Sequence, residues 1–421
     1  MLISFTVGNF YSIKEPVTLD MQSVGQVSEF KENIVLAGQN KLLRSAVIYG
    51  ANGSGKSNVI EAMAFCKNYV HDSIRYQEGD KVKTLIPFLL GTQGADSPSF
   101  FEVEFLVETI KYRYGFELTD ERICGEWLFV LPEKKRKEQE LFIRESQIIE
   151  VSKKFKEGEL LEDKTRDNAL FLSVCAQFNG KISKKLIEFF SDFNVISGID
   201  DKQYIDFTSK FIKETSNQDL LVQSLNQIGL EIEDVVERNV SEDVIPKGLP
   251  AKISQRHLDM TVHFVERKQL DEDGKECGRV QIPLDGGESA GTQKYFYLMG
   301  PLHDTLKHGK VLVIDELDAR LHPKLTLNII RMFHDPVIND KGAQLIFATH
   351  DTNLLASGQF RRDQIYFTEK NRCSATELYS LSEVKVRKDA SFEKDYLKGR
   401  YGAIPFMGSL DFMEQFSGKE R

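Results

Sequence analysis

A glycine-rich segment near the start of the chain limits the available folds more than any other feature. Residues 50–57 read Gly-Ala-Asn-Gly-Ser-Gly-Lys-Ser, after the apolar run Ser45–Tyr49 and before the helical apolar spacing of Ser57–Val70. Strand, glycine-rich loop and helix in this order form a P-loop, in which glycine lets backbone N–H groups turn toward phosphate oxygens. The N-terminus of the helix adds a positive potential. The segment therefore predicts an α/β domain that binds a phosphorylated ligand.

The P-loop pattern also gives roles to individual residues. We expect Lys56 to reach the β- and γ-phosphates of a nucleotide and the Ser57 hydroxyl to bind Mg²⁺. ATP and Mg²⁺ are accordingly the predicted ligands, and the alternative is a glycine-rich turn that binds nothing. The predicted nucleotide-binding residues are Gly50, Ala51, Asn52, Gly53, Ser54, Gly55, Lys56, Ser57 and Asn58.

Two later apolar strands end in polar residues that suit hydrolysis. The run Val311–Asp315 is followed by Glu316, and a second apolar run ends in Thr349 and His350. Asp315 would hold Mg²⁺ through water, and Glu316 would orient and polarise the attacking water. Acids and histidines at strand ends are often only structural, but a preceding P-loop favours catalysis. The predicted catalytic residues are Glu316, His350 and Lys56.

Between these motifs lies Gly286–Lys294, a glycine-rich segment before a helix expected at about 289–307. Ser289 suits the N-cap of that helix. The ordered series of P-loop, Asp315-Glu316 and His350 resembles the ABC-type ATPase heads. In those heads the histidine contacts the γ-phosphate. A Ser-x-Gly signature binds the γ-phosphate held by the opposite subunit. The resemblance implies a trans signature at Ser289, Ala290, Gly291 and Thr292, and hydrolysis only in a dimer. The alternative is a simple glycine-rich helix cap.

The opening of the chain is similar to one branch of this class. Residues 9–12 read Asn-Phe-Tyr-Ser, where the RecF/SMC-like and OLD-like proteins have Asn-Phe-Arg-Ser, so Tyr11 replaces an arginine. Asn9 and Ser12 are candidates for the adenine side of the pocket. The segment Leu317–Pro323 also resembles the RecF/SMC-like and OLD-like branch. The segment Tyr396–Pro405 is similar to the tail of the AAA15/AAA21-type ATP-binding proteins of bacterial defence operons, among them RloA and AbiL and, more loosely, the ATPase of PARIS systems.

The order of predicted elements gives the fold class. Residues 2–7 and 17–21 predict a hairpin, residues 100–131 a three-stranded β-meander with a fourth strand at 141–144, and residues 167–238 helices. We expect an α/β ABC-ATPase head, with a P-loop sheet, helices and an N-terminal β subdomain, and an inserted β-meander and helical region. The expected segments are 1–75 (lobe with the P-loop), 76–166 (β-rich part), 167–258 (helical insertion) and 259–421 (lobe with signature, Walker B strand and His350).

Composition narrows the environment and the partners. The formal net charge of -9 argues against a surface coated by nucleic acid, although the basic runs at 134–137 and 153–156 leave local DNA contact open. The five cysteines form no C-x-x-C pair, which disfavours zinc sites and disulfide frameworks. The N-terminus lacks the features of a signal peptide, and no apolar run approaches the roughly 18 residues of a membrane span. We expect a cytoplasmic protein with no membrane contact.

The resemblance implies a biological role. The chain shows no sustained heptads, and too few residues follow His350 for the TOPRIM nuclease of OLD proteins. We therefore expect a regulatory or sensor ATPase of an anti-phage, abortive-infection-like system, working as a homodimer or higher homo-oligomer with a separately encoded effector, for which a nuclease is one class. The alternatives are a RecF-like DNA repair clamp, a transporter ATPase and a scaffold that barely hydrolyses ATP. Gln177 or Gln93 would sense Mg²⁺, unless each is only a polar residue beside the core.

Overall fold

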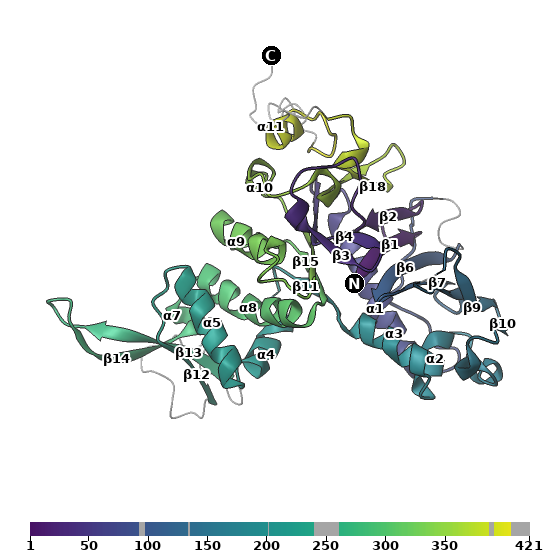
Figure 1. The fold of residues 1–421 in the computed structure, drawn as a ribbon, viewed down its shortest axis with the longest axis horizontal. Helices are drawn as coiled ribbons and strands as arrows, with labels where there is room; N and C mark the ends of the chain where they lie inside the picture. Colours follow the sequence, from purple (N-terminus) through teal and green to yellow (C-terminus); the bar gives the residue numbers. More distant parts are fainter. Residues whose placement is uncertain (92–96, 134, 201, 240–260, 387–390, 406–421) are drawn as a thin grey trace, which may run out of the picture. The chain divides into compact units, whose positions relative to one another are not determined.

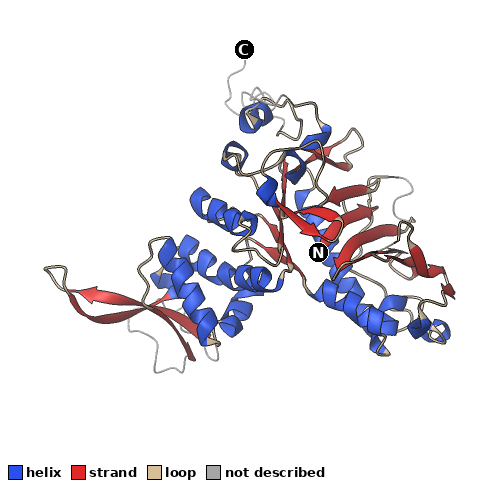
Figure 2. Ribbon diagram, in the orientation of Figure 1, coloured by secondary structure: helices blue, strands red, loops and turns tan. Residues whose placement is uncertain are grey.

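The computed structural model describes residues 1–91, 97–133, 135–200, 202–239, 261–386 and 391–405, and it divides into two compact units. Unit 1 consists of Met1 and Asp192–Phe347, and unit 2 of Leu2–Ser191 and Ala348–Arg421. Both units combine helices and strands (Figures 1 and 2). The α/β class predicted from the sequence is therefore confirmed.

Unit 2 contains a seven-stranded antiparallel sheet with the order β10-β9-β8-β7-β6-β1-β2. The predicted hairpin and the predicted meander both belong to it, and the register pairs Phe5 with Val103 and Tyr114 with Leu128. Side chains alternate between buried and partly exposed along most of β6, as expected for a sheet with one covered face. The strands are β1 (Leu2–Gly8), β2 (Val17–Asp20), β6 (Ser99–Val107), β7 (Ile110–Leu118), β8 (Ile123–Leu131), β9 (Gln139–Glu145) and β10 (Ile148–Val151).

Helices α1 (Lys56–Asp72), α2 (Phe171–Gln177) and α3 (Lys181–Ser191) pack with this sheet. The core between them is aromatic: Phe65 of α1 stacks on Phe101 at 5.0 Å between ring centroids, and Phe101 stacks on Phe116 at 5.3 Å. The only tryptophan of the chain, Trp127, is half-buried in β8 and lies over Gly115, where a Cβ would collide with the indole. Its Nε1–H donates to Glu102 Oε2 at 2.7 Å.

A buried ion pair ties the sheet to the start of α2. Glu126 is fully buried and lies 3.8 Å from Arg144. Its carboxylate accepts hydrogen bonds from the Tyr114 hydroxyl at 2.9 Å and from the backbone N–H groups of Phe171 and Leu172 at 2.7 and 3.0 Å. Burial raises the pKa of Glu126, although Arg144 and the two N–H groups act in the opposite direction. The carboxylate therefore accepts from two N–H groups at the start of α2 that have no acceptor within the helix.

The remaining strands of unit 2 include the P-loop strand and a separate hairpin. β5 (Ser45–Gly50) is buried at every position and pairs in parallel with β17 (Ile365–Lys370), which pairs antiparallel with β18 (Thr376–Ser380). β3 (Ile34–Ala37) and β4 (Asn40–Leu43) form a hairpin. The short helices α10 (Asn353–Ala356) and α11 (Phe392–Leu397) complete the unit. The predicted strand at 45–49 is confirmed, whereas β18 was not predicted.

Unit 1 contains three parallel strands, β11 (Phe193–Ser197), β15 (Val311–Asp315) and β16, which spans Gln344–Ala348 and therefore contains the boundary between the units. β11 is a correction to the helical region expected at 167–238, because its five residues pair with β15. A short apolar run does not reveal by its spacing whether it is a strand or part of a buried helix. The boundaries between the two units lie at 191/192 and 347/348. β11, which falls in the expected helical insertion, therefore belongs to the same unit as β15 of the expected C-terminal lobe.

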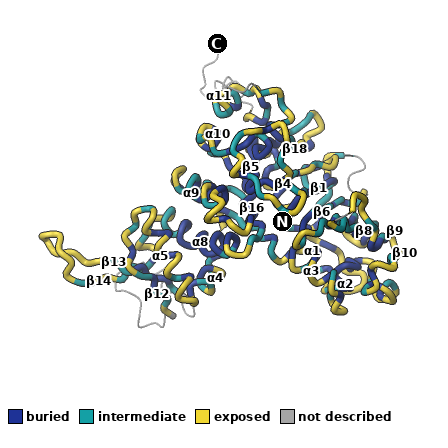
Figure 3. The backbone as a smooth tube through the Cα atoms, in the orientation of Figure 1, coloured by how far each residue is buried: buried dark blue, intermediate teal, exposed yellow. Residues whose placement is uncertain are grey.

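The helices of unit 1 gather around α8 (Ala290–His308), which is buried along most of its length (Figure 3). α4 (Lys202–Phe211) and α5 (Thr215–Gln227) contact it, and α9 (Pro323–His334) follows the Walker B strand. β12 (Asp234–Asn239), β13 (Thr261–Leu270) and β14 (Glu276–Pro283) form a separate sheet, whose β13–β14 hairpin is long and largely exposed toward its turn (Figures 1 and 3). The short helix α7 (Leu284–Gly287) connects β14 to α8.

Two histidines are buried against α8 and α5. His263 lies beside Tyr297, with 3.3 Å between Nδ1 and the hydroxyl, and His303 lies 2.8 Å from the Ser224 hydroxyl. Their exposed fractions are 1% and 8%, and burial lowers the pKa of each to about 4. Both imidazoles are therefore neutral in the folded unit well below the ordinary histidine pKa.

We expect unit 1 to lose stability as the pH falls from 6.5 toward 4. An unfolded chain takes up protons at these histidines below pH 6.5, while the folded unit does not, so the stability present above 6.5 is lost progressively on acidification. At pH 5 the loss should be about 2 kcal/mol for each histidine. Urea unfolding followed by circular dichroism at pH 7 and pH 5 measures it. His303→Gln should reduce the difference between the two pH values, whereas the same change at exposed His308 should not.

Within the described residues, no helix is both long and apolar enough to cross a membrane. All five cysteines are free thiols.

Candidate nucleotide-binding site

The P-loop connects β5 to α1, as predicted, and its glycines are required by its geometry. Gly53 and Gly55 have left-handed backbones, with φ of 76° and 109°. A Cβ at Gly55 would collide with Thr376, and a Cβ at Gly50 would collide with Thr368. Residues with a side chain rarely adopt such backbones. Glycine is therefore required at Gly50 and Gly55 for lack of space, and at Gly53 and Gly55 for the backbone conformation.

Side chains from β17 and β18 brace the loop from behind. The hydroxyls of Ser54 and Thr368 lie 2.6 Å apart, and the Thr376 hydroxyl donates to the Ser54 carbonyl at 2.8 Å. Lys370 Nζ donates to Thr376 Oγ1 at 3.0 Å. These contacts were not predicted, because β18 was not predicted and isolated threonines have no distinctive pattern.

The expected ligand-binding groups have distinct environments. Lys56 is only 6% exposed, and its Nζ donates to the carbonyls of Gly50 and Ala51 at 2.9 and 3.2 Å. The ammonium is therefore held at the base of the loop. Asn52, Gly53 and Ser57 are exposed, and Ser57 lies in the first turn of α1. The backbone N–H groups of that turn have no partners within the helix and are suited to phosphate oxygens.

The N-terminal loop contributes one of its two expected residues to the P-loop. The Ser12 hydroxyl lies 2.7 Å from that of Thr376 and accepts from Asn58 Nδ2 at 2.5 Å. Asn9 instead organises the β subdomain, since Nδ2 donates to the Ser97 carbonyl at 2.8 Å and Oδ1 accepts from the Phe88 N–H at 3.0 Å. Ser12 thus remains a candidate for shaping the nucleotide pocket, while the Asn9 side chain is used in the fold.

His350 follows a strand end that is fastened to the P-loop strand. The Thr349 N–H donates to the Ile48 carbonyl at 3.2 Å, and the Tyr49 hydroxyl donates to the Asp351 carbonyl at 3.2 Å. His350 itself is exposed between these two contacts. Its neighbours therefore hold its backbone beside the last residues of β5, where the P-loop begins.

The two acids at the end of β15, Asp315 and Glu316, belong to unit 1. Within the described residues, Asp315 Oδ1 is buried and has no hydrogen-bond partner. A buried carboxylate oxygen of this kind fits a water-mediated Mg²⁺ ligand, because buried charge is stabilised by a cation or a hydrogen bond. Glu316 has a left-handed backbone with φ of 52°, which is uncommon for a residue other than glycine.

The loop after β11 supports these acids. The Gly198 N–H donates to the Asp315 carbonyl at 2.6 Å, and a Cβ at Gly198 would collide with the Glu316 carbonyl. The Arg320 guanidinium donates to the Ile199 carbonyl at 3.0 Å. Gly198 was not among the predicted site residues, because its role depends on β11 lying beside β15.

We expect Gly198→Ala to lower the turnover of ATP on the order of 10²-fold. The added methyl would displace the Glu316 peptide, and a small misplacement of a group that orients the attacking water is costly in catalysis. Affinity for ATP should change little, since the P-loop belongs to unit 2. Steady-state phosphate release and binding of a fluorescent ATP analogue measure the two effects. Gly278→Ala in the exposed hairpin is the matched control; unchanged turnover in the Gly198 variant would show that the loop does not position Glu316.

The signature segment has the predicted cap. The Ser289 hydroxyl accepts from the Thr292 N–H at 3.1 Å, and Ser289 and Ala290 are exposed. The preceding Glu288 pairs with Arg267 of β13 at 2.7 Å. The serine therefore presents the start of a long helix to solvent, where an anion is favoured.

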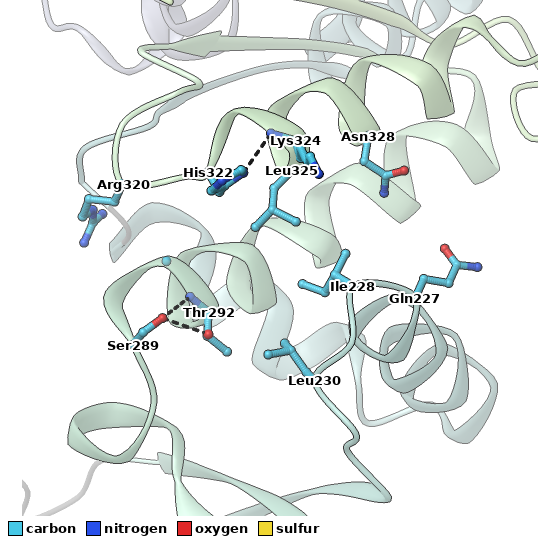
Figure 4. Close-up of a pocket in the computed structure, with 11 residues that line it drawn as sticks. Gln227, Ile228, Leu230, Ser289, Thr292, Arg320, His322, Lys324, Leu325 and Asn328 are labelled. Atoms are coloured by element: carbon cyan, nitrogen blue, oxygen red, sulfur yellow. Dashed lines mark hydrogen bonds between the residues drawn. The ribbon is translucent and has the colours of Figure 1, made fainter.

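A cavity of about 710 Å³ lies beside this helix start within unit 1 (Figure 4). Its lining includes the basic residues Arg320 and Lys324 and no acidic residue, which favours an anionic occupant. His322 caps α9 by accepting the Lys324 N–H at 3.2 Å. The lining residues are Gln227, Ile228, Leu230, Ser289, Gly291, Thr292, Arg320, His322, Lys324, Leu325 and Asn328.

The two glutamines considered as Mg²⁺ sensors gain no support here. Gln177 ends α2 and is exposed, and within the described part of the chain no hydrogen bond links it to the P-loop. Gln93 lies outside the described residues. No group of three or more His, Cys, Asp or Glu side chains in the described ranges could hold a metal ion. Mg²⁺ would therefore depend largely on nucleotide phosphates for its ligands, which is its usual mode of binding in ATPases.

Comparison with known proteins identifies the family of this chain. Residues 45–356 match the family described as "AAA domain, putative AbiEii toxin, Type IV TA system". No curated protein matches the chain significantly. The matched residues make up about three quarters of the chain and extend from the P-loop strand past His350. The chain therefore belongs to this family of AAA-domain P-loop ATPases.

Proposed function

We propose that the protein hydrolyses ATP with Mg²⁺ at a site completed by a second copy of the chain. We further propose that this ATPase is the regulatory component of an anti-phage, abortive-infection-like system in the cytoplasm. The ATP-driven closing of the dimer would control a separately encoded effector.

The observation that carries the chemical part is the preformed P-loop. This loop suits the phosphates of ATP for three reasons. Its glycines have the required geometry, Thr368 and Thr376 hold it in place, and the Lys56 ammonium is buried at its base. Glu316 and His350 are the residues that distinguish a hydrolase from a scaffold. The side chain of Glu316 suits the activation of water, and His350 suits contact with the γ-phosphate.

The exposed signature supports the dimer. Ser289 caps α8 and leaves the helix start open to solvent, which suits the γ-phosphate of a nucleotide bound by another copy. Two copies related by a twofold axis would each supply one P-loop and one signature, so that two sites form together. A higher homo-oligomer could be built from such dimers.

Each group would have one role in the reaction. The P-loop N–H groups and Lys56 bind and orient the phosphates, and the partner's signature adds positive potential at the γ-phosphate. Bound Mg²⁺, held by Ser57 and Asp315, would neutralise charge on the β- and γ-phosphates. Glu316 orients the attacking water and accepts its proton. The departing ADP and phosphate would remove the link between the two copies.

The biological part rests on the family and on the resemblance of the sequence. The family description refers to a putative toxin of a type IV toxin–antitoxin system. The opening at residues 9–12 and the segment Leu317–Pro323 resemble the OLD-like branch. The segment Tyr396–Pro405 is similar to the tail of ATPases of defence operons, including the RloA and AbiL type and, more loosely, the PARIS type. The effector partner, with a nuclease as one class, follows from the same resemblance.

Mass photometry of the purified protein tests the proposal, alone and co-expressed with its genomic neighbour, with and without ATP·Mg²⁺. We expect an assembly of several ATPase copies that retains the neighbour and changes with nucleotide. A dimer that forms only with ATP and ignores the neighbour would contradict effector control. DNA-stimulated hydrolysis would then be measured, because that result identifies the RecF-like alternative.

A further inference from the structure

A buried lysine joins the signature helix to the loop that follows Glu316. Lys294 lies in α8 shortly after Ser289, and its exposed fraction is 0%. Its Nζ donates to the Leu317 carbonyl at 3.0 Å and to the Ala319 carbonyl at 2.6 Å. A buried ammonium is stable only when it is hydrogen-bonded, so the lysine and the loop fix each other.

The loop that receives these hydrogen bonds has an unusual backbone. The Ala319 N–H donates to the Glu316 carbonyl at 3.1 Å, which forms a tight turn directly after the catalytic residue. Glu316 and Arg320 have left-handed backbones, with φ of 52° and 61°. Non-glycine residues keep such backbones only where their surroundings impose them. The two hydrogen bonds from Lys294 are part of that constraint.

A second contact joins the same two segments. An ideal Cβ at Gly291 would lie 2.9 Å from the Arg320 carbonyl, so the first turn of α8 packs closely on the loop. Gly291 and Lys294 therefore hold the loop at two points, while Ser289 at the end of the same helix remains exposed. A shift of the helix start would move the loop, and with it Glu316.

We propose that Lys294 is a positioning residue that couples occupation of the signature by the partner's nucleotide to the placement of Glu316. The inference rests on the proposed function, because it requires that Glu316 and the signature act in hydrolysis. Lys294 does not touch the nucleotide in this mechanism. Its effect is on kcat, while the affinity of the P-loop for ATP is independent of it.

The test compares Lys294→Met with the wild type. Methionine is similar in length and apolar, and it removes both hydrogen bonds. The expected result is a fall in kcat on the order of 10–10²-fold, from misplacement of the water-orienting group. The Kd of a fluorescent ATP analogue should stay within about twofold of the wild-type value, because a positioning effect leaves the P-loop intact. Lys307→Met, an exposed lysine on the same helix, is the matched control.

A second readout separates positioning from a general structural role. The double variant Lys294→Met/Glu316→Gln should still form a closed dimer with ATP in mass photometry, since Ser289 remains in place. Wild-type kcat in the single variant, or loss of the ATP-dependent dimer in the double variant, would overturn the inference. If the methionine protein is insoluble, Lys294→Gln, which keeps one neutral donor, replaces it under the same criteria.

The proposed function fails in a different way. It fails if the wild type does not hydrolyse ATP, or if Glu316→Gln and Ser289→Ala both leave turnover unchanged. An active wild type that depends on Glu316 and Ser289, combined with an unaffected Lys294 variant, rejects the positioning role alone.

Discussion

Replacing Glu316 by glutamine should nearly abolish turnover and trap an ATP-bound dimer. The amide keeps the size of the side chain but cannot accept the proton of the attacking water, and loss of a general base typically lowers the rate by about 10²–10⁴-fold. The P-loop and the signature are untouched, so ATP should still join two copies. Phosphate release measures the first effect, and mass photometry with ATP·Mg²⁺ measures the second.

Two further variants serve as controls for the role of Glu316 as the general base. Glu272→Gln, in the exposed turn of the β13–β14 hairpin, makes the same chemical change away from the site and should behave as the wild type. Adding Ser289→Ala to Glu316→Gln should weaken the dimer, because the helix start then loses its capping hydroxyl. Unchanged turnover in the Glu316 variant would mean that another residue activates the water.

Glu126→Ala should be the most destabilising single change in the β subdomain. It leaves Arg144 buried without its carboxylate and removes the acceptor used by Tyr114, Phe171 and Leu172. Breaking a buried ion pair by removal of one partner costs about 3–5 kcal/mol. Chemical unfolding at neutral pH measures the loss.

The matched control is Glu140→Ala, an exposed glutamate on the adjacent strand β9, which should change stability by less than about 0.5 kcal/mol. Glu126→Gln should fall between the two, because the amide oxygen still accepts one or two hydrogen bonds. A Glu126→Ala protein as stable as the wild type would show that the backbone N–H groups at the start of α2 find other partners.

Local sequence signals predicted much of this structure. The P-loop, the Ser289 cap and the strand before Asp315 each depend on neighbouring residues, and each lies where it was expected. The meander at 100–131 was equally clear, because turn residues separate three runs rich in strand-forming residues. Such features need no knowledge of the rest of the fold.

The features that were not predicted depend on distant pairing. β11 is a strand because β15 lies beside it, and its five residues alone do not distinguish a strand from a helix. Thr368 and Thr376 reach the P-loop only through the β17–β18 pairing. Lys294 and Gly198 likewise act on the backbone near Glu316 from other elements. Spacing along the sequence contains no record of these contacts.

Trp127 is an intrinsic fluorescent probe of one part of the molecule. The indole is packed over Gly115 and bonded to Glu102, and no other tryptophan occurs in the chain. Its emission therefore reports on the seven-stranded sheet of unit 2 alone, while circular dichroism reports on both units. A denaturation curve measured by emission that departs from the curve measured by dichroism would reveal that the two units melt as separate cooperative bodies.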